Sequence, residues 1–178
     1  MCKYFKPYEI LPPRIYNEYG DKGLRWINPK LLSVMDFLRE ELGVAIIINN
    51  WKKGGSYKYR GLRVKESDVW KELSDHSFGN ACDFNANGLS ANEIREKILN
   101  EYAEELKLLG LSAIEDETYA PTWVHVSVAD FSEWKDVKEI NGIKILRDMT
   151  KEKNNDPSVN NNTPETNSIK PDTGDTKK

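Results

Sequence analysis

Two histidines and one aspartate are the side chains of this sequence best suited to hold a metal ion. The 178-residue chain contains only two histidines, His76 and His125, and Asp83 follows His76 by seven positions. Two imidazoles and a carboxylate supply three ligands and leave a fourth tetrahedral position for water, which is the pattern of catalytic zinc sites. The alternative is that both histidines are only hydrogen-bonded, because a single His–Asp spacing of this kind also arises by chance.

The segments around Asp83 and His125 have the pattern of β-strands. Because side chains alternate along a strand, His125 shares one face of the strand predicted at 121–128 with Trp123, and the valines take the other face. Asp83 lies in a strand predicted at 81–86, where a carboxylate is costly to bury unless a positive group pairs with it. A metal ion bound by both side chains would meet that need.

The rest of the chain up to residue 149 alternates between helical and strand patterns. A helix is predicted over 29–42, ending before Gly43. Ser90 and Glu93 form a capping box that opens a second helix, which is expected to extend to near Gly110. Two further strands are predicted at 44–48 and 111–114. Together these elements favour a small α+β domain with a mainly antiparallel sheet flanked by helices.

The composition changes after residue 149. Residues 150–178 contain only two aliphatic side chains, Val159 and Ile169. Such a segment cannot bury enough apolar surface to offset the entropy of ordering it. We therefore predict a folded domain over residues 1–149 and a disordered polar tail over 150–178.

Charge and composition exclude several classes of protein. The net charge of −3 argues against binding to nucleic acid. No apolar run approaches the length of a membrane span, and the N-terminus lacks the apolar core of a signal peptide, which predicts synthesis in the cytoplasm. Cys2 and Cys82 are expected to be free thiols, and Cys82 points away from the face of Asp83. The pattern makes no prediction about the oligomeric state.

The order of residues around the three candidate ligands resembles a known family. Residues 74–83 have the form Ser-x-His-x-x-Gly-x-Ala-x-Asp, and Trp-Val-His-Val follows at 123–126. This combination is similar to the zinc D-alanyl-D-alanine carboxypeptidase family of murein peptidases. Further likeness to bacteriophage members of the family lies at 10–13, 37–39, 48–55 and 60–63.

The resemblance spans about residues 5–130 and implies both a fold and an activity. It implies zinc on His76, Asp83 and His125, and the compact α+β domain that these peptidases share with the hedgehog signalling domain. The implied reaction is hydrolysis of peptide bonds in peptidoglycan stem peptides, by a D,D-carboxypeptidase or an endopeptidase. Such a protein would reach the cell wall after phage lysis or as a component of a virion.

Hydrolysis of this kind also needs a general base. Zinc lowers the pKa of a bound water to about 7, and a nearby carboxylate accepts the proton and later passes it to the leaving amine. The candidates are Glu115, Asp116 and Glu117, which precede the strand of His125. We favour Glu115, because it ends the preceding strand, with Asp116 next. The alternative for this cluster is a solvated acidic turn.

The resemblance implies that a basic segment at 51–65 is the substrate loop. It carries six basic residues interleaved with aromatic ones and no acid. Arg63 is the first choice for polarising or anchoring the substrate and Arg60 the second, because a guanidinium binds a carboxylate with paired hydrogen bonds. Trp123 shares the face of His125 and is expected to wall the site, with a packing role as the alternative. Ser74 is expected to orient the histidine loop, either by supporting the ligand or by capping the loop. The alternative for the basic segment is a solvated loop.

Two positions depart from the family pattern. Many members place an acid three residues before the last histidine, and phage members often place one two residues after it; here these positions are Thr122 and Ser127. The departures leave two other interpretations open. One is a catalytically inactive zinc-binding or virion-assembly module, and the other is a metal-free structural or interaction protein.

Overall fold

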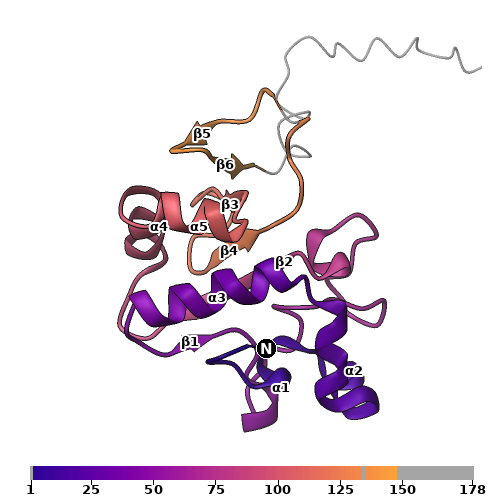
Figure 1. Cartoon of the computed structure of the whole chain (residues 1–178). Helices are drawn as coiled ribbons and strands as arrows, with labels where there is room; N and C mark the ends of the chain where they lie inside the picture. The colour runs from indigo at the N-terminus through magenta and orange to yellow at the C-terminus, as the bar shows by residue number, and fades with distance from the viewer. Residues whose placement is uncertain (1, 134, 148–178) are drawn as a thin grey trace, which may run out of the picture. The chain divides into compact units, whose positions relative to one another are not determined.

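A mixed six-stranded sheet organises the described part of the chain. The computed structural model describes residues 2–133 and 135–147, and its strands follow the order β1-β2-β4-β3-β6-β5 (Figure 1). The strands are β1 (Ile46–Ile47), β2 (Ala81–Ala86), β3 (Ala113–Glu115), β4 (Val124–Ser127), β5 (Glu139–Ile140) and β6 (Ile143–Leu146). Residues 1–147 group into one compact unit. The tail predicted at 150–178 lies outside the described residues.

The central strands are antiparallel, as predicted, and their register places Asp83 directly opposite His125. β4 also pairs in antiparallel fashion with β3, and β3 pairs with β6 in parallel. The sequence did not predict β5 and β6. The predicted class, a small α+β domain, is confirmed, and the parallel pair makes the sheet mixed.

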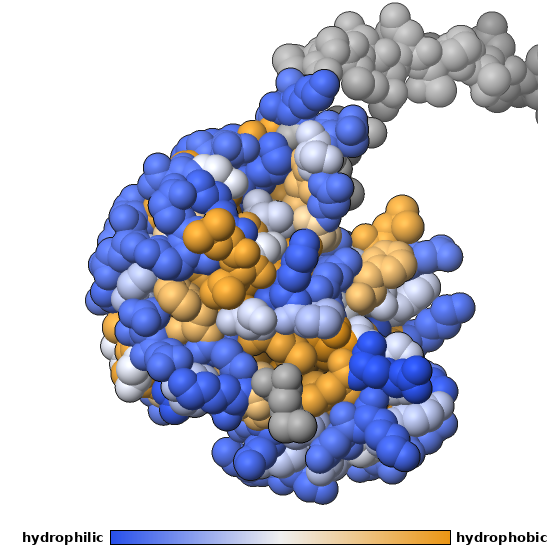
Figure 2. Space-filling view, viewed as in Figure 1, coloured by the Kyte–Doolittle hydropathy of each residue, from blue (hydrophilic) through white to orange (hydrophobic). Residues whose placement is uncertain are grey.

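Helices cover one face of this sheet. The helical elements are α1 (Pro7–Ile10), α2 (Pro13–Tyr19), η1 (Gly20–Trp26), α3 (Pro29–Glu41), η2 (Trp51–Lys53), η3 (Asp75–Phe78), α4 (Ala91–Asn100) and α5 (Ala103–Leu109). Figure 1 shows α3, α4 and α5 in front of the sheet, and their buried residues join one hydrophobic core with β2 and β4. Seen from the same side, hydrophilic residues cover the left edge of the surface, and hydrophobic residues show near its middle (Figure 2). No helix of the described residues is both long and apolar enough to cross a membrane.

The strand pattern correctly predicted which side chains enter the core. Phe84 of β2 and Val124 and Val126 of β4 are fully buried in it, and so is Cys82, which is a free thiol. The alternate positions therefore lie on the opposite face of the sheet, where Asp83 is found. This division between the two faces separates the core from the candidate site.

The helix predicted from Ser90 to near Gly110 is two helices in the structure. The capping box is present, because the Ser90 hydroxyl accepts from the Glu93 amide at 3.2 Å and the Glu93 carboxylate accepts from the Ser90 amide at 2.7 Å. α4 ends at Asn100, and α5 begins at Ala103. Between them the Tyr102 ring packs edge-on against Phe37 of α3, with ring centroids 5.8 Å apart. This contact with α3 fixes the break, and helical periodicity alone does not reveal it.

Gly79 joins the N-terminal half of the domain to the turn that carries His76. Its φ is +69°, and a Cβ atom built on it would lie 2.0 Å from the Trp26 carbonyl oxygen. Its own carbonyl accepts a hydrogen bond from the Asn28 amide at 3.0 Å. Only glycine fits, because both the backbone angle and the close backbone approach exclude a side chain.

We expect Gly79→Ala to destabilise the fold more than Gly88→Ala does. Gly88 has a similar φ of +76°, but a Cβ atom there would meet nothing within 4 Å. Gly88→Ala should cost about 1–2 kcal/mol from the left-handed backbone alone, and Gly79→Ala should cost clearly more. Urea unfolding of both variants measures the difference, and equal costs would contradict the close approach.

Candidate metal centre

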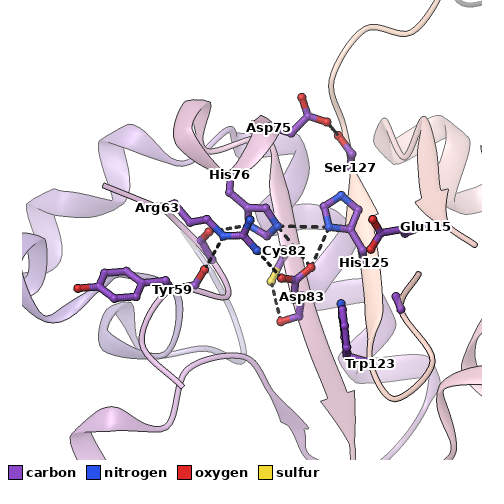
Figure 3. A network of polar contacts seen from close by, with 12 residues as sticks. Tyr59, Arg63, Asp75, His76, Cys82, Asp83, Glu115, Trp123, His125 and Ser127 are labelled. Atoms are coloured by element: carbon purple, nitrogen blue, oxygen red, sulfur yellow. Dashed lines mark hydrogen bonds and ion pairs between the residues drawn. The ribbon is translucent and has the colours of Figure 1, made fainter. Parts of the chain in front are cut away.

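Three side chains from three elements converge on one point beside the sheet. His76 comes from η3, Asp83 from β2 and His125 from β4. One ligand atom from each lies within 4.8 Å of the other two, so the group could hold a metal ion. His76 and Asp83 are 2% and 7% exposed. The structure therefore brings together all three ligands that the sequence predicted, and Figure 3 shows them facing one another.

The distances between the ligand atoms fit a small tetrahedral ion. His125 Nδ1 lies 2.8 Å from Asp83 Oδ1, His76 Nε2 lies 3.3 Å from the same oxygen, and the two nitrogens are 3.2 Å apart. Bonds of about 2.0–2.1 Å in a tetrahedron place neighbouring ligand atoms about 3.3–3.4 Å apart. An ion could therefore sit among these atoms with only small movements of the side chains.

The hydrogen bond on the far side of His76 fixes which nitrogen is available. His76 Nδ1 lies 2.9 Å from the Gly61 carbonyl oxygen. A carbonyl can only accept, so Nδ1 carries the proton and Nε2 presents its lone pair. That lone pair faces the Asp83 carboxylate and the other imidazole, and a positive centre between them would relieve the repulsion. Orientation of a metal-binding imidazole by a carbonyl is common in metal sites.

The pKa values of the three candidate ligands are shifted in different directions. Burial lowers the pKa of His76, so its imidazole is neutral. Burial acts to raise the pKa of Asp83, but the two imidazoles outweigh it and hold that pKa well below its usual value. For His125, burial acts to lower the pKa, and the hydrogen bond to Asp83 reverses the direction. The cluster thus contains an ionised carboxylate beside a neutral imidazole.

Arg63 contacts the second carboxylate oxygen of Asp83. Its Nη2 donates to Asp83 Oδ2 at 2.7 Å, and its Nε donates to the Tyr59 carbonyl at 3.1 Å. The sequence suggested Arg63 as a residue that grips substrate. The structure instead places its guanidinium on the ligand carboxylate (Figure 3).

The three candidate acids differ in their surroundings. Glu115 ends β3, and continuing the β3–β4 register by one residue places it opposite His125. Figure 3 shows its carboxylate beside the His125 ring. Burial raises the pKa of Glu115. The pKa of Asp116 is lowered, because its carboxylate accepts hydrogen bonds from the Thr118 hydroxyl and, at 2.9 Å, from the Thr118 amide. Glu117 is exposed. Glu115 is thus the acid nearest to the candidate ligands.

Arg60 contacts side chains on the same face of the sheet as Asp83. Its guanidinium stacks on the Tyr57 ring, 3.9 Å from the centroid, and Nη1 donates to Asn85 Oδ1 at 2.6 Å. Asn85 follows Asp83 by two positions on β2 and therefore points to the same side. Trp123 is half-buried below His125 in Figure 3 and borders this region.

The histidine loop is held differently from the sequence prediction. Ser74 stands at the N-cap of η3, but its side chain makes no capping hydrogen bond, and its carbonyl accepts from the Ser77 amide at 2.8 Å. Asp75, the next residue, holds this loop through its side chain. Its Oδ2 accepts from the hydroxyl of fully buried Ser127 at 2.7 Å. This bond ties the loop of His76 to the strand of His125.

The two positions that depart from the family pattern differ in their structural surroundings. Ser127, where an acid is often found, connects β4 to η3 through Asp75. Thr122 is exposed, and its carbonyl accepts a hydrogen bond from the Asn85 amide group. The sequence showed the unusual serine but not its partner, because the two residues lie 52 positions apart.

Arg95 holds the loop that joins β3 to β4, and the sequence did not indicate this role. This arginine of α4 is 6% exposed and donates to the carbonyls of Glu115 at 3.1 Å, Trp123 at 2.8 Å and Ala120. A buried guanidinium has five donors, which makes it suited to collecting carbonyls from an irregular loop. It thereby fixes the ends of the two strands that carry Glu115 and His125.

Comparison of the chain with known protein families, with curated proteins and with solved structures found no match.

We expect His76→Ala and Asp83→Asn to lose metal binding. Removal of either ligand leaves two donors, so zinc affinity should fall by more than about 100-fold, beyond the loss typical of supporting residues. Equilibrium dialysis against zinc followed by metal analysis of the protein measures the change. Asp68→Asn, which alters an exposed acid, is the matched control and should keep the wild-type affinity. Equal binding by all four proteins would show that the cluster is only hydrogen-bonded.

Arg95→Met should destabilise the domain without removing its metal ligands. The substitution keeps the apolar stem but leaves buried carbonyls without a donor, at a cost of about 2 kcal/mol or more. Urea unfolding measures this cost, with Arg25→Met at an exposed position as the control. A loss no larger than that of the control would contradict the role given to Arg95.

Proposed function

We propose that this chain is a zinc-dependent peptidase that hydrolyses peptide bonds of peptidoglycan stem peptides, as a D,D-carboxypeptidase or an endopeptidase. The observation that carries the proposal is the convergence of His76, Asp83 and His125 with ligand atoms 2.8–3.3 Å apart. Glu115 lies beside them on the next strand. We include in this proposal the resemblance to bacteriophage members of the zinc D-alanyl-D-alanine carboxypeptidase family. The hedgehog-like fold that the resemblance implies is part of the same proposal.

The choice of zinc follows from the donors. Two imidazole nitrogens and one carboxylate oxygen are typical of catalytic zinc sites, and a site with three protein ligands keeps one position open. Bound zinc would polarise a carbonyl and lower the pKa of a water molecule to about 7. Gly61 keeps the Nε2 atom of His76 unprotonated for this purpose.

Glu115 is the general base in this proposal. Its carboxylate accepts a proton from the attacking water and then donates it to the nitrogen of the leaving amine. Burial raises its pKa above the ordinary value, which brings it closer to the pH at which such a group transfers protons efficiently. Many family members carry an acid at the position of Thr122. In this proposal Glu115, on a neighbouring strand, takes the place of that acid.

Substrate binding falls to the open region beside Asn85. The Arg60 guanidinium is held by the Tyr57 ring and by Asn85, which leaves other donors for a carboxylate of the stem peptide. The Trp123 indole borders the same region and would pack against the peptide. Arg63 is not assigned to the substrate, because its guanidinium is bound to Asp83.

We expect Glu115→Gln to keep zinc and lose hydrolysis. The amide has nearly the same shape but cannot accept the proton of the water, so the rate should fall by about 100-fold or more. Purified sacculi are incubated with zinc-loaded protein or with chelator-treated protein, and the muropeptides are analysed by mass spectrometry. Glu117→Gln changes an exposed neighbour and should retain the wild-type rate.

Two outcomes of this experiment would redirect the proposal. Full turnover by Glu115→Gln would move the base to Asp116 or Glu117. Zinc binding by the wild-type chain without release of any peptide fragment would favour the inactive zinc-binding or assembly module instead.

A further inference from the structure

We propose that Arg63 is a positioning residue that makes Asp83 a one-oxygen metal ligand. By holding Oδ2, Arg63 leaves only Oδ1 free to bind, and it thereby keeps the centre four-coordinate with one open position. The inference rests on the metal site of the proposed function, but it does not depend on which bond is cut.

The two carboxylate oxygens of Asp83 have separate partners. Oδ1 faces the imidazoles, at 2.8 Å from His125 Nδ1 and 3.3 Å from His76 Nε2. Oδ2 accepts from Arg63 Nη2 at 2.7 Å. A carboxylate that binds an ion through both oxygens must turn its two oxygens towards the same point. The ion pair with Arg63 opposes that rotation, because the rotation would break a charge-assisted hydrogen bond.

Arg63 is itself held in place at both ends. Its backbone amide donates to the His76 carbonyl at 3.1 Å, and its Nε donates to the Tyr59 carbonyl at 3.1 Å. Its side chain is 18% exposed, so little solvent competes with these bonds. The guanidinium cannot leave Asp83 without giving up the contact with Tyr59 as well.

The same short segment supports the other ligands. The Gly61 carbonyl orients His76, and the Asp83 amide donates to the Arg60 carbonyl at 2.7 Å. A Cβ atom at Gly61 would lie 2.2 Å from the Ile10 carbonyl oxygen, so the segment is packed against the N-terminal region. Residues 59–63 thus contact two of the candidate ligands, His76 and Asp83, and Arg63 supplies the ion pair with Asp83 among these contacts.

The charge of Arg63 has a second consequence for the ion. Asp83 is the one carboxylate in the ligand cluster. A guanidinium at 2.7 Å shares its negative charge, so Asp83 donates less to the metal than a free carboxylate would. A metal ion whose positive charge is less neutralised by its ligands is a stronger Lewis acid. Arg63 therefore acts on the metal through Asp83, without contact with the substrate.

The test uses cobalt(II) in place of zinc, because its visible spectrum reports the number of ligands. Four-coordinate cobalt absorbs strongly, and the band weakens when a fifth ligand binds. The full-length wild-type chain, Arg63→Gln, Arg63→Lys and Arg60→Gln are titrated with cobalt(II). The wild type should give the strong band. Arg63→Gln should lose intensity, because Oδ2 is released and joins the ion.

The two other variants separate this role from a general loss of charge. Arg63→Lys keeps a cation that can donate to Oδ2 and should recover the strong band, since the contact uses a single nitrogen. Arg60→Gln removes a neighbouring cation whose guanidinium contacts Asn85 and Tyr57 and not the Asp83 carboxylate, and its spectrum should match the wild type. An unchanged band in Arg63→Gln, or an equal loss in Arg60→Gln, would overturn the proposal.

A second measurement keeps the proposal falsifiable if Arg63→Gln does not fold, which circular dichroism would show. A crystal structure of the zinc-loaded wild-type protein must then show Asp83 bound through one oxygen and Arg63 on the other. Asp83 bound through both oxygens would overturn the proposal.

The outcomes distinguish this inference from the proposed function. A strong band in the wild type that weakens in Arg63→Gln, without cleavage of sacculi, would support the inference and remove the peptidase. Cleavage with an unchanged spectrum in Arg63→Gln would remove the inference alone. A wild-type chain that binds no cobalt and no zinc would overturn both.

Discussion

The buried carboxylate of Asp83 is the constraint on which the centre depends. An ionised carboxylate that is 7% exposed costs several kcal/mol unless it is paired. Its partners come from distant parts of the chain, because Arg63 precedes it by 20 residues and His125 follows it by 42. Stabilising the Asp83 carboxylate thus requires that the loop carrying Arg63 and the strand carrying His125 both lie next to β2. The metal that we propose would complete this neutralisation, since a cation among Asp83 and the two imidazoles satisfies all three at once.

The sheet fixes the relative positions of Asp83, His125 and Glu115. Asp83 and His125 are opposite each other in the β2–β4 register, and Glu115 continues the row on β3. Side chains on neighbouring strands that point to the same face are held about 5 Å apart. A ligand, a second ligand and a base can therefore be set by backbone hydrogen bonds alone. Arg95 and the Asp75–Ser127 bond then fix the irregular segments at the ends of these strands.

Function here is argued from the site, because a small α+β sheet by itself is compatible with many activities. The two neighbouring arginines illustrate why the geometry matters. From the sequence, Arg63 is the first choice for polarising or anchoring the substrate and Arg60 the second. In the structure one guanidinium lies on an aromatic ring and an amide, and the other on the ligand carboxylate. The Arg63 guanidinium is thus part of the candidate metal centre, whereas the Arg60 guanidinium has other partners.

The sequence by itself predicted the three residues that meet in the candidate metal centre, the strand faces and the helix that starts after Asn28, because these predictions rest on local periodicity, capping and residue chemistry. Only the tertiary structure decided the partners of Arg63, the bond between Asp75 and Ser127, the role of Arg95 and the parallel strand β6. Each of these depends on contacts between residues far apart in the chain. Local sequence patterns do not reveal such contacts, because the segments come together only when the whole domain packs.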